Sequence, residues 1–200
     1  MKNVLAIAAL VAAAGTVANG QIFNEIGDAT DVLPGQSVTN GTLQIVGFNG
    51  GGDNDVFAFN WSGGDLVIDA RDAGFDTQLH LFDYSGNGIG ENDDSVNYGL
   101  NSEIALTLAA GNYLIGITSF NNDALDGAAL PIFGFTNTFS ANNGNFIQGP
   151  EGNGTLAAWD GLSDGGDYNI YFSSAVNAIP APGAMALLGL GGIAAIRRRR

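Results

Sequence analysis

The sequence predicts an all-β protein whose body, residues 21–178, folds as an antiparallel, jelly-roll-like β-sandwich. Short runs in this region alternate apolar and polar residues, which is the period of a half-buried strand, and helical periodicity is scarce. The chain contains 31 glycines, and Gly, Asn and Asp separate the runs, as turns between strands require. Several short strands joined by such turns are typical of a sandwich or barrel.

The first predicted strand is DVFAFNW, residues 55–61, whose alternation turns Phe57, Phe59 and Trp61 toward the core. Apolar rows of this kind build a sandwich core when two sheets face each other about 10 Å apart.

Residues 120–155 are rich in Gly and Asn, and we expect a long loop there that carries one or two strands.

The second predicted strand is DLVIDA, residues 65–70. It follows Gly63 and Gly64, a turn pair that favours a hairpin with the preceding strand. The remaining predicted strands are TQLHLFD (77–83), EIALTL (103–108), NYLIGIT (112–118) and DYNIYFSS (167–174).

Charge is segregated along the chain. All 20 acidic residues lie in the body, where Arg71 is the one basic residue, while Lys2 and Arg197 to Arg200 lie at the ends. Nucleic-acid affinity rests on Lys and Arg contacts to phosphate, so this composition excludes nucleic acid as a partner. Cations, or high-salt surroundings, are the natural counterparts of such a body. The chain has no cysteine, which removes thiol catalysis and cysteine-based metal sites.

The N-terminus has the pattern of a secretory signal peptide, residues 1–20. Lys2 supplies a positive start, Val4–Ala14 form an apolar helix, and the small residues Ala18 and Gly20 offer cleavage positions. A buried N-terminal helix is the alternative interpretation.

The C-terminus, residues 179–200, has three parts. Pro180, Ala181 and Pro182 break regular structure, residues 183–196 form a short apolar helix, and the chain ends with Arg197, Arg198, Arg199 and Arg200. As a helix the apolar part reaches about 21 Å, short of a ~30 Å hydrocarbon core. Arginine snorkelling and bilayer thinning relieve such a mismatch, and the arginines stay cytoplasmic.

This tripartite tail resembles the PEP-CTERM sorting signal of Gram-negative bacteria, with Ala181 in place of the glutamate that gives the signal its name. The resemblance implies an exosortase-type sorting protease as partner, a transient anchor in the inner membrane, and delivery to the cell surface or outside the cell. A plain C-terminal membrane anchor is the alternative.

Residues 53–119 resemble the bacterial pre-peptidase C-terminal (PPC) family. The stretches that carry this resemblance are GDNDVFAFNWSGGDLVIDA, FDTQLHLFDYSGNGIGENDD and LAAGNYLIGIT. Members of that family are secreted jelly-roll-like sandwiches, usually non-catalytic, that help with secretion, matrix attachment or calcium binding. The resemblance implies such a role here.

Acidic and amide side chains gather in the predicted loops and form a candidate calcium site. Calcium takes six to eight oxygen ligands at about 2.3–2.6 Å, and Asp, Asn and Gly-rich loops provide such oxygens. The alternative is that these residues are turn formers that keep an exported protein hydrated. The candidate ligands are Asp53, Asp55, Asp76, Asp83, Asn87, Asp93 and Asp94.

No catalytic motif accompanies these acids, and we expect a non-enzymatic protein. His80 is the only histidine, lacks a G-x-S-x-G partner, and is expected at the surface or sheet rim. Arg71 is expected to pair with a nearby acid such as Asp69 or Asp72. Aromatic residues either form a carbohydrate-stacking platform or belong to the core, the commoner case. They are Trp61, Phe75, Tyr84, Tyr98 and Trp159.

Together these features predict an exported, exosortase-sorted, non-catalytic surface or matrix protein that calcium stabilises. A module that binds extracellular polysaccharide is the alternative. A hydrolase, which would require a cleft with converging carboxylates of raised pKa, is a third possibility.

Overall fold

A computed structural model of the chain describes residues 20–140, 145–161 and 164–180. The predicted signal helix, the apolar segment 183–196 and the sorting residues Ala181, Pro182 and Arg197 to Arg200 lie outside the described residues. The described part contains strands and no helix, and hence no helix there that is long and apolar enough to cross a membrane.

The strands are β1 (Gln21–Asn24), β2 (Gln36–Ser37), β3 (Thr42–Asn49), β4 (Asp55–Trp61), β5 (Gly64–Asp69), β6 (Thr77–Asp83), β7 (Gly88–Asn92), β8 (Glu103–Leu108), β9 (Gly111–Ser119), β10 (Ala124–Leu125), β11 (Phe133–Ser140), β12 (Phe146–Pro150), β13 (Ala158–Trp159) and β14 (Gly166–Val176). The predicted strands 55–61, 77–83 and 103–108 are confirmed with the bounds that alternation gave. The strand β3 was not among the predicted ones.

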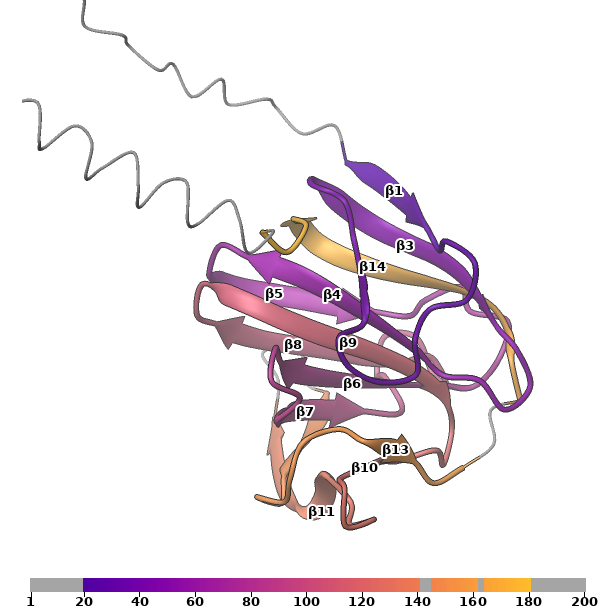
Figure 1. The fold of residues 1–200 in the computed structure, drawn as a ribbon, viewed down its shortest axis with the longest axis vertical. Helices are drawn as coiled ribbons and strands as arrows, with labels where there is room; N and C mark the ends of the chain where they lie inside the picture. Colours follow the sequence, from indigo (N-terminus) through magenta and orange to yellow (C-terminus); the bar gives the residue numbers. More distant parts are fainter. Residues whose placement is uncertain (1–19, 141–144, 162–163, 181–200) are drawn as a thin grey trace, which may run out of the picture.

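Two sheets form a sandwich (Figure 1). A five-stranded sheet has the order β1-β3-β14-β5-β8, and a seven-stranded sheet has the order β11-β12-β7-β6-β9-β4-β2. The short strands β10 and β13 pair separately. Most neighbours are antiparallel, as predicted, but β1 pairs with β3 and β2 with β4 in parallel. The sandwich is therefore mixed rather than antiparallel throughout, because of the N-terminal strands β1 and β2.

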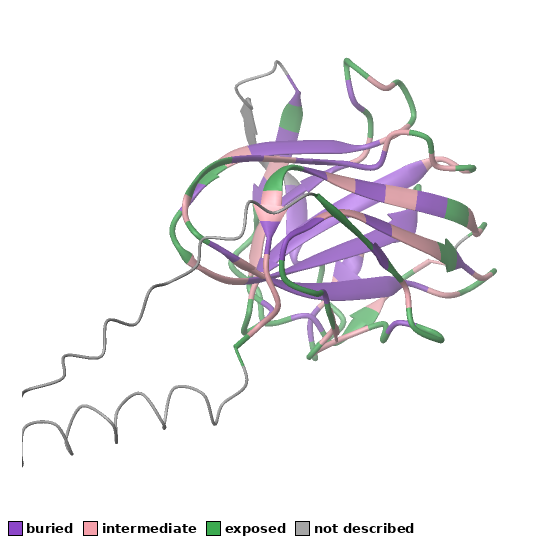
Figure 2. Cartoon of the chain, turned by 90° about the horizontal axis from the view of Figure 1, so that it is seen from above, coloured by how far each residue is buried: buried purple, intermediate pink, exposed green. Residues whose placement is uncertain are grey.

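The main core lies between the two sheets. Phe57, Phe59 and Trp61 of β4 point into it, as the alternation predicts, and each is at least nine-tenths buried. Across the interface, the rings of Phe59 and Phe172 lie 5.3 Å apart between centroids. Figure 2 shows the buried strands at the centre and the exposed residues mostly on the connecting loops and the rim.

A second apolar cluster covers the outer face of the seven-stranded sheet. Phe82 and Leu114 of that sheet pack with Ile132, Phe133 and Leu156, which come from the long segment after β9. Residues 120–155 carry the short strand β10 and the antiparallel pair β11 and β12, so the expectation of one or two strands there is too low. Because the segment folds back over the sheet, the central strands are buried on both faces.

The predicted hairpin at Gly63 and Gly64 is wrong. β4 pairs with β9 and β2 in one sheet, whereas β5 pairs with β8 and β14 in the other. The glycine pair has positive φ angles of 97° and 107° and turns the chain from one sheet to the facing one. A glycine turn predicts a reversal of direction but does not say which sheet the returning strand joins.

Candidate metal centre

Asp76, Asp93 and Asp94 converge at one end of the seven-stranded sheet. Asp76 directly precedes β6, and the other two directly follow β7, its antiparallel neighbour. Because the two strands are antiparallel, the start of β6 and the end of β7 lie at the same end of the sheet. One carboxylate oxygen from each residue lies within 4.8 Å of the other two.

The three carboxylates lack enough donors for their oxygens. The Oδ1 atoms of Asp76 and Asp93 are both buried from solvent and have no hydrogen-bond partner. Burial, followed by the charges of Asp94 and Asp76, raises the pKa of Asp93 to about 6. Burial and then Asp94 also raise the pKa of Asp76. A bound cation would satisfy these oxygens and relieve the repulsion among them.

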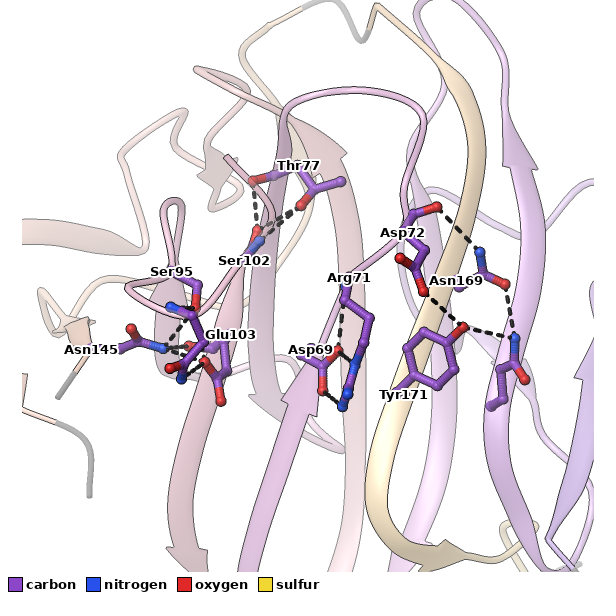
Figure 3. Close-up of polar contacts among 12 residues, drawn as sticks. Asp69, Arg71, Asp72, Thr77, Ser95, Ser102, Glu103, Asn145, Asn169 and Tyr171 are labelled. Carbon is purple, nitrogen blue, oxygen red and sulfur yellow. Dashed lines mark hydrogen bonds and ion pairs between the residues drawn. The ribbon is translucent and has the colours of Figure 1, made fainter. Parts of the chain in front are cut away.

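Hydrogen bonds hold the loop after β7 in place. The Asn92 side chain accepts from the Glu103 amide at 2.6 Å and donates to the carbonyl of Phe146 at 2.8 Å. Asn145 accepts from the amide of Val96 at 2.8 Å and donates to Glu103 Oε2 at 2.9 Å. Ser95 donates to that same oxygen, and Figure 3 shows Ser95, Glu103 and Asn145 meeting at this point. The carboxylates of Asp93 and Asp94 are therefore carried on a fixed loop.

Further acids lie behind the three aspartates. Glu91, at the end of β7, is 2% exposed and accepts from Gln78 Nε2 at 2.8 Å. Asp123 accepts from the same amide nitrogen at 2.9 Å. Burial and then the neighbouring Asp94, Asp76, Glu91 and Asp123 charges act together on Asp93. The electrostatic potential at the three aspartates is thus strongly negative.

His80 is buried, so the prediction that it lies at the surface is wrong. Its ring has no exposed area, its Nδ1 lies 3.0 Å from Glu91 Oε2, and its Nε2 lies 3.1 Å from Thr118 Oγ1. Trp159, from the covering segment, packs edge-on against it with centroids 4.9 Å apart. The alternation placed His80 opposite Leu79 correctly, but the covering segment shields that outer face. Thr118 is equally buried and donates to a backbone carbonyl, so His80, Glu91 and Thr118 form a buried polar group.

A cavity of about 420 Å³ opens beside the three aspartates. Asp93, Asp94 and Ser95 form one side of it, and Val96 and Phe146 contribute apolar walls. Phe146 is 72% exposed, the most exposed large apolar side chain of the described residues. The cavity has space for a ligand larger than an ion next to the carboxylates.

Asp83 and Asn87, two of the predicted ligands, form a closed turn instead. Asp83 Oδ1 accepts from the amides of Ser85 and Asn87 at 2.8 and 3.0 Å, and its Oδ2 accepts from Asn87 Nδ2 at 2.8 Å. For this pair the turn interpretation describes the structure.

Asp53 and Asp55, the last two predicted ligands, lie in a different acidic cluster. Carboxylate oxygens of Asp55, Glu25 and Asp28 lie within 4.8 Å of one another, and Asp53 contacts Asp28. Burial is the main cause that raises the pKa of Asp55 to about 8, and the charges of Glu25, Asp53 and Asp28 add to it. Sequence reasoning missed Glu25 and Asp28 because they stand alone in the loop after β1, and only the fold brings them to Asp55.

Arg71 has the structural role that its sequence surroundings predict. Its guanidinium forms two hydrogen bonds with the buried Asp69 and lies 4.9 and 5.0 Å from the ring centroids of Tyr98 and Tyr171. Figure 3 shows Asp69 against Arg71, with Tyr171 bonded to Asp72 nearby. Arg71, the one Lys or Arg side chain of the body, thus pairs with Asp69 and not with a carboxylate of either acidic cluster.

The aromatic residues do not form one platform. Trp61 is in the main core, Phe75 packs on its edge, and Trp159 covers His80. Tyr98 lies against Arg71, which leaves Tyr84, 41% exposed, as the open ring of the set.

No protein-family model matches the chain, and no curated protein sequence matches it.

Proposed function

We propose that this protein is an exported, non-catalytic β-sandwich that binds calcium and acts at the cell surface or in the extracellular matrix. The observation that carries the proposal is the convergence of Asp76, Asp93 and Asp94 on a braced loop, with two buried oxygens that lack a donor. A site with oxygen ligands and neither His nor Cys suits a hard cation. Among hard cations, calcium accepts a variable number of oxygen ligands in flexible geometry.

Export and sorting are proposed from the two ends of the chain. The signal pattern of residues 1–20 and the PEP-CTERM-like tail of residues 179–200 support passage through the inner membrane and recognition by an exosortase. The acidic body fits a calcium-rich exterior. We also propose that the body is related to PPC domains, which are jelly-roll-like sandwiches. The two-sheet architecture is compatible with this relationship.

Thermal unfolding tests the calcium proposal. A ligand at about 100 times its Kd stabilises a native state by about 2.7 kcal/mol, which raises Tm by ~5–10 °C for a domain of this size. We expect this rise when calcium replaces chelator, and a smaller rise in Asp93→Asn. Asp31→Asn, an exposed aspartate outside both clusters, is the matched control. An unchanged wild-type Tm would sink the proposal.

The sorting proposal has its own test. Deleting residues 180–200 should move the protein to a different cell fraction, because the tail would no longer hold it at the membrane. If the truncated and intact chains fractionate alike, the tail is not a sorting signal.

Binding of extracellular polysaccharide is a second candidate function. The cavity beside Asp93 and Asp94, with its exposed Phe146, favours it, since sugars stack on open rings and their hydroxyls can ligate calcium. A glycan array with and without calcium tests it, and binding that is lost in Phe146→Ala but kept in Tyr84→Ala would place the ligand in this cavity.

A further inference from the structure

The second acidic cluster joins the N-terminal segment to the body of the sandwich. Glu25 and Asp28 come from the loop after β1, and Asp55 is the first residue of β4 in the other sheet. A carboxylate oxygen from each lies within 4.8 Å of the other two. Asp53 contacts Asp28 and brings a fourth carboxylate to the same place.

Asp55 gives independent evidence that the cluster is built for a ligand. Its side chain has no exposed area, and its Oδ2 accepts from Tyr168 Oη at 2.7 Å across the sandwich. Its Oδ1 is buried as well and has no hydrogen-bond partner. A buried carboxylate oxygen without a donor is costly, and native proteins rarely keep one unless a ligand satisfies it.

The described part of the chain offers no positive side chain to this cluster. Arg71 is its only Lys or Arg, and that residue is paired with Asp69 and packed between two tyrosine rings. His80 is paired with Glu91. The positive charge that would balance Glu25, Asp28 and Asp55 must then come from solution.

Existing hydrogen bonds orient the ligands and leave lone pairs open. Glu25 Oε1 accepts from the amide of Ala29 at 2.8 Å, and Glu25 Oε2 accepts from the amide of Phe48 at 3.0 Å. The bond from Phe48 holds the carboxylate against β3. Glu25 Oε2 also accepts from Tyr168 Oη at 3.4 Å, whereas Oε1 retains a further lone pair. Asp28 is exposed, so the cluster has an open side through which an ion can enter.

We propose that Glu25, Asp28 and Asp55 form a second divalent-cation site, which takes calcium and fastens the N-terminal segment to the sandwich. The donors are all oxygens, and neither His nor Cys is present, so a hard cation is preferred to a transition metal. Magnesium demands octahedral geometry and keeps its water, whereas calcium accepts several carboxylates of mixed geometry.

The site matters because β1 is weakly held. It is an edge strand of four residues, next to β3 in Figure 1. It pairs with β3 alone, in parallel, with an irregular register at Gln21. An ion shared by the loop after β1 and by Asp55 ties this edge to the facing sheet. Without the ion, this tie is absent. The inference goes beyond the proposed function and does not depend on the site at Asp93.

Hydrogen–deuterium exchange of the full chain, kept in mild detergent for its apolar ends, tests the inference. With calcium chloride at about ten times its Kd, the amides of residues 21–31 should exchange about tenfold more slowly than in chelator. Asp28→Asn, at an exposed position, should abolish this protection. Asp31→Asn, with the same charge change three residues away, should keep it.

Ion stoichiometry separates this site from the first. Wild-type protein should bind one more calcium ion than Asp28→Asn and one more than Asp93→Asn, as measured by calorimetry. Loss of calcium protection in residues 21–31 for Asp93→Asn but not for Asp28→Asn would overturn the inference, and so would wild-type protection that calcium leaves unchanged. A wild type that is protected at residues 21–31 but binds no ion at Asp93 would instead sink only the proposed function.

Discussion

Replacing Asp55 by Asn should stabilise the calcium-free protein at neutral pH. Asp55 is fully buried, and burial is the largest cause that raises its pKa to about 8, against the opposing hydrogen bond from Tyr168. In the unfolded chain the same carboxyl ionises near its ordinary pKa of about 3.9. Between these values the unfolded chain has lost a proton that the native state still holds. The free energy of unfolding therefore has its full value, as far as Asp55 is concerned, below about pH 4. It falls as the pH rises from about 4 toward 8.

The size of the effect follows from the pKa. The loss is about 1.4 kcal/mol for each pH unit, so it reaches ~4 kcal/mol between about pH 4 and pH 7. Asparagine has the shape of the protonated side chain, keeps an acceptor for Tyr168, and cannot ionise. For a domain of this size, ~4 kcal/mol corresponds to ~8–16 °C in Tm.

Circular dichroism melts in excess chelator, at about pH 5 and about pH 8, measure the difference between wild type and Asp55→Asn. The wild-type Tm should fall more steeply with pH. Other groups whose pKa is raised, such as Asp93, affect the Tm of both proteins equally, so their effect cancels in the difference. With calcium, the Tm of wild type should rise by more than that of the variant, which keeps only the site at Asp76, Asp93 and Asp94, so the gap between the two melting temperatures should narrow. Parallel pH profiles in chelator would refute the reasoning.

Three further changes separate structural acids and bases from ion ligands. Asp83→Asn should cost ~1–2 kcal/mol in chemical denaturation with or without calcium, because it removes a turn acceptor rather than a ligand. Equal calcium responses in variant and wild type check this. Arg71→Ala should cost ~3 kcal/mol by leaving Asp69, 1% exposed, without its cation, and Arg71→Lys should cost less. His80→Ala should lower stability by ~2–4 kcal/mol through the cavity left under Trp159, while calcium binding persists. A calcium response lost in His80→Ala would assign that ring to the site.

Alternation along single strands was sufficient to predict much of the fold. It placed Phe57, Phe59 and Trp61 in the core and gave the bounds of β4, β6 and β8, because a half-buried strand alternates in a way that needs no knowledge of its partners. Alternation failed where the exposure of a residue depends on a segment that is distant in the sequence. His80 reads as an outward residue, and it is buried because Trp159, far along the sequence, covers the sheet.

The acidic residues show the same division. Asp76, Asp93 and Asp94 could be grouped from sequence, since they flank two strands that are neighbours in both chain and sheet. Asp55 was singled out from sequence, but its partners Glu25 and Asp28 were not, because the contact depends on two sheets packing face to face. Asp83 lies apart from both clusters in a closed turn, and sequence alone does not separate the two cases because a closed turn and an ion site use the same residue types.

Calcium should act on this protein in a way that sodium chloride of equal ionic strength does not. Screening works over a Debye length of about 10 Å at 0.1 M salt, and it is weaker still for buried groups. Within each cluster one carboxylate oxygen from each residue lies within 4.8 Å of the others, and Asp55 is closed to solvent, so diffuse ions leave most of the repulsion in place. An ion that enters the cluster removes it. We therefore expect a rise in Tm with calcium that is several-fold larger than with sodium at matched ionic strength. If sodium gave the same rise, the acids would be ordinary hydrated loops whose mutual repulsion salt screens, and neither cluster would be a site.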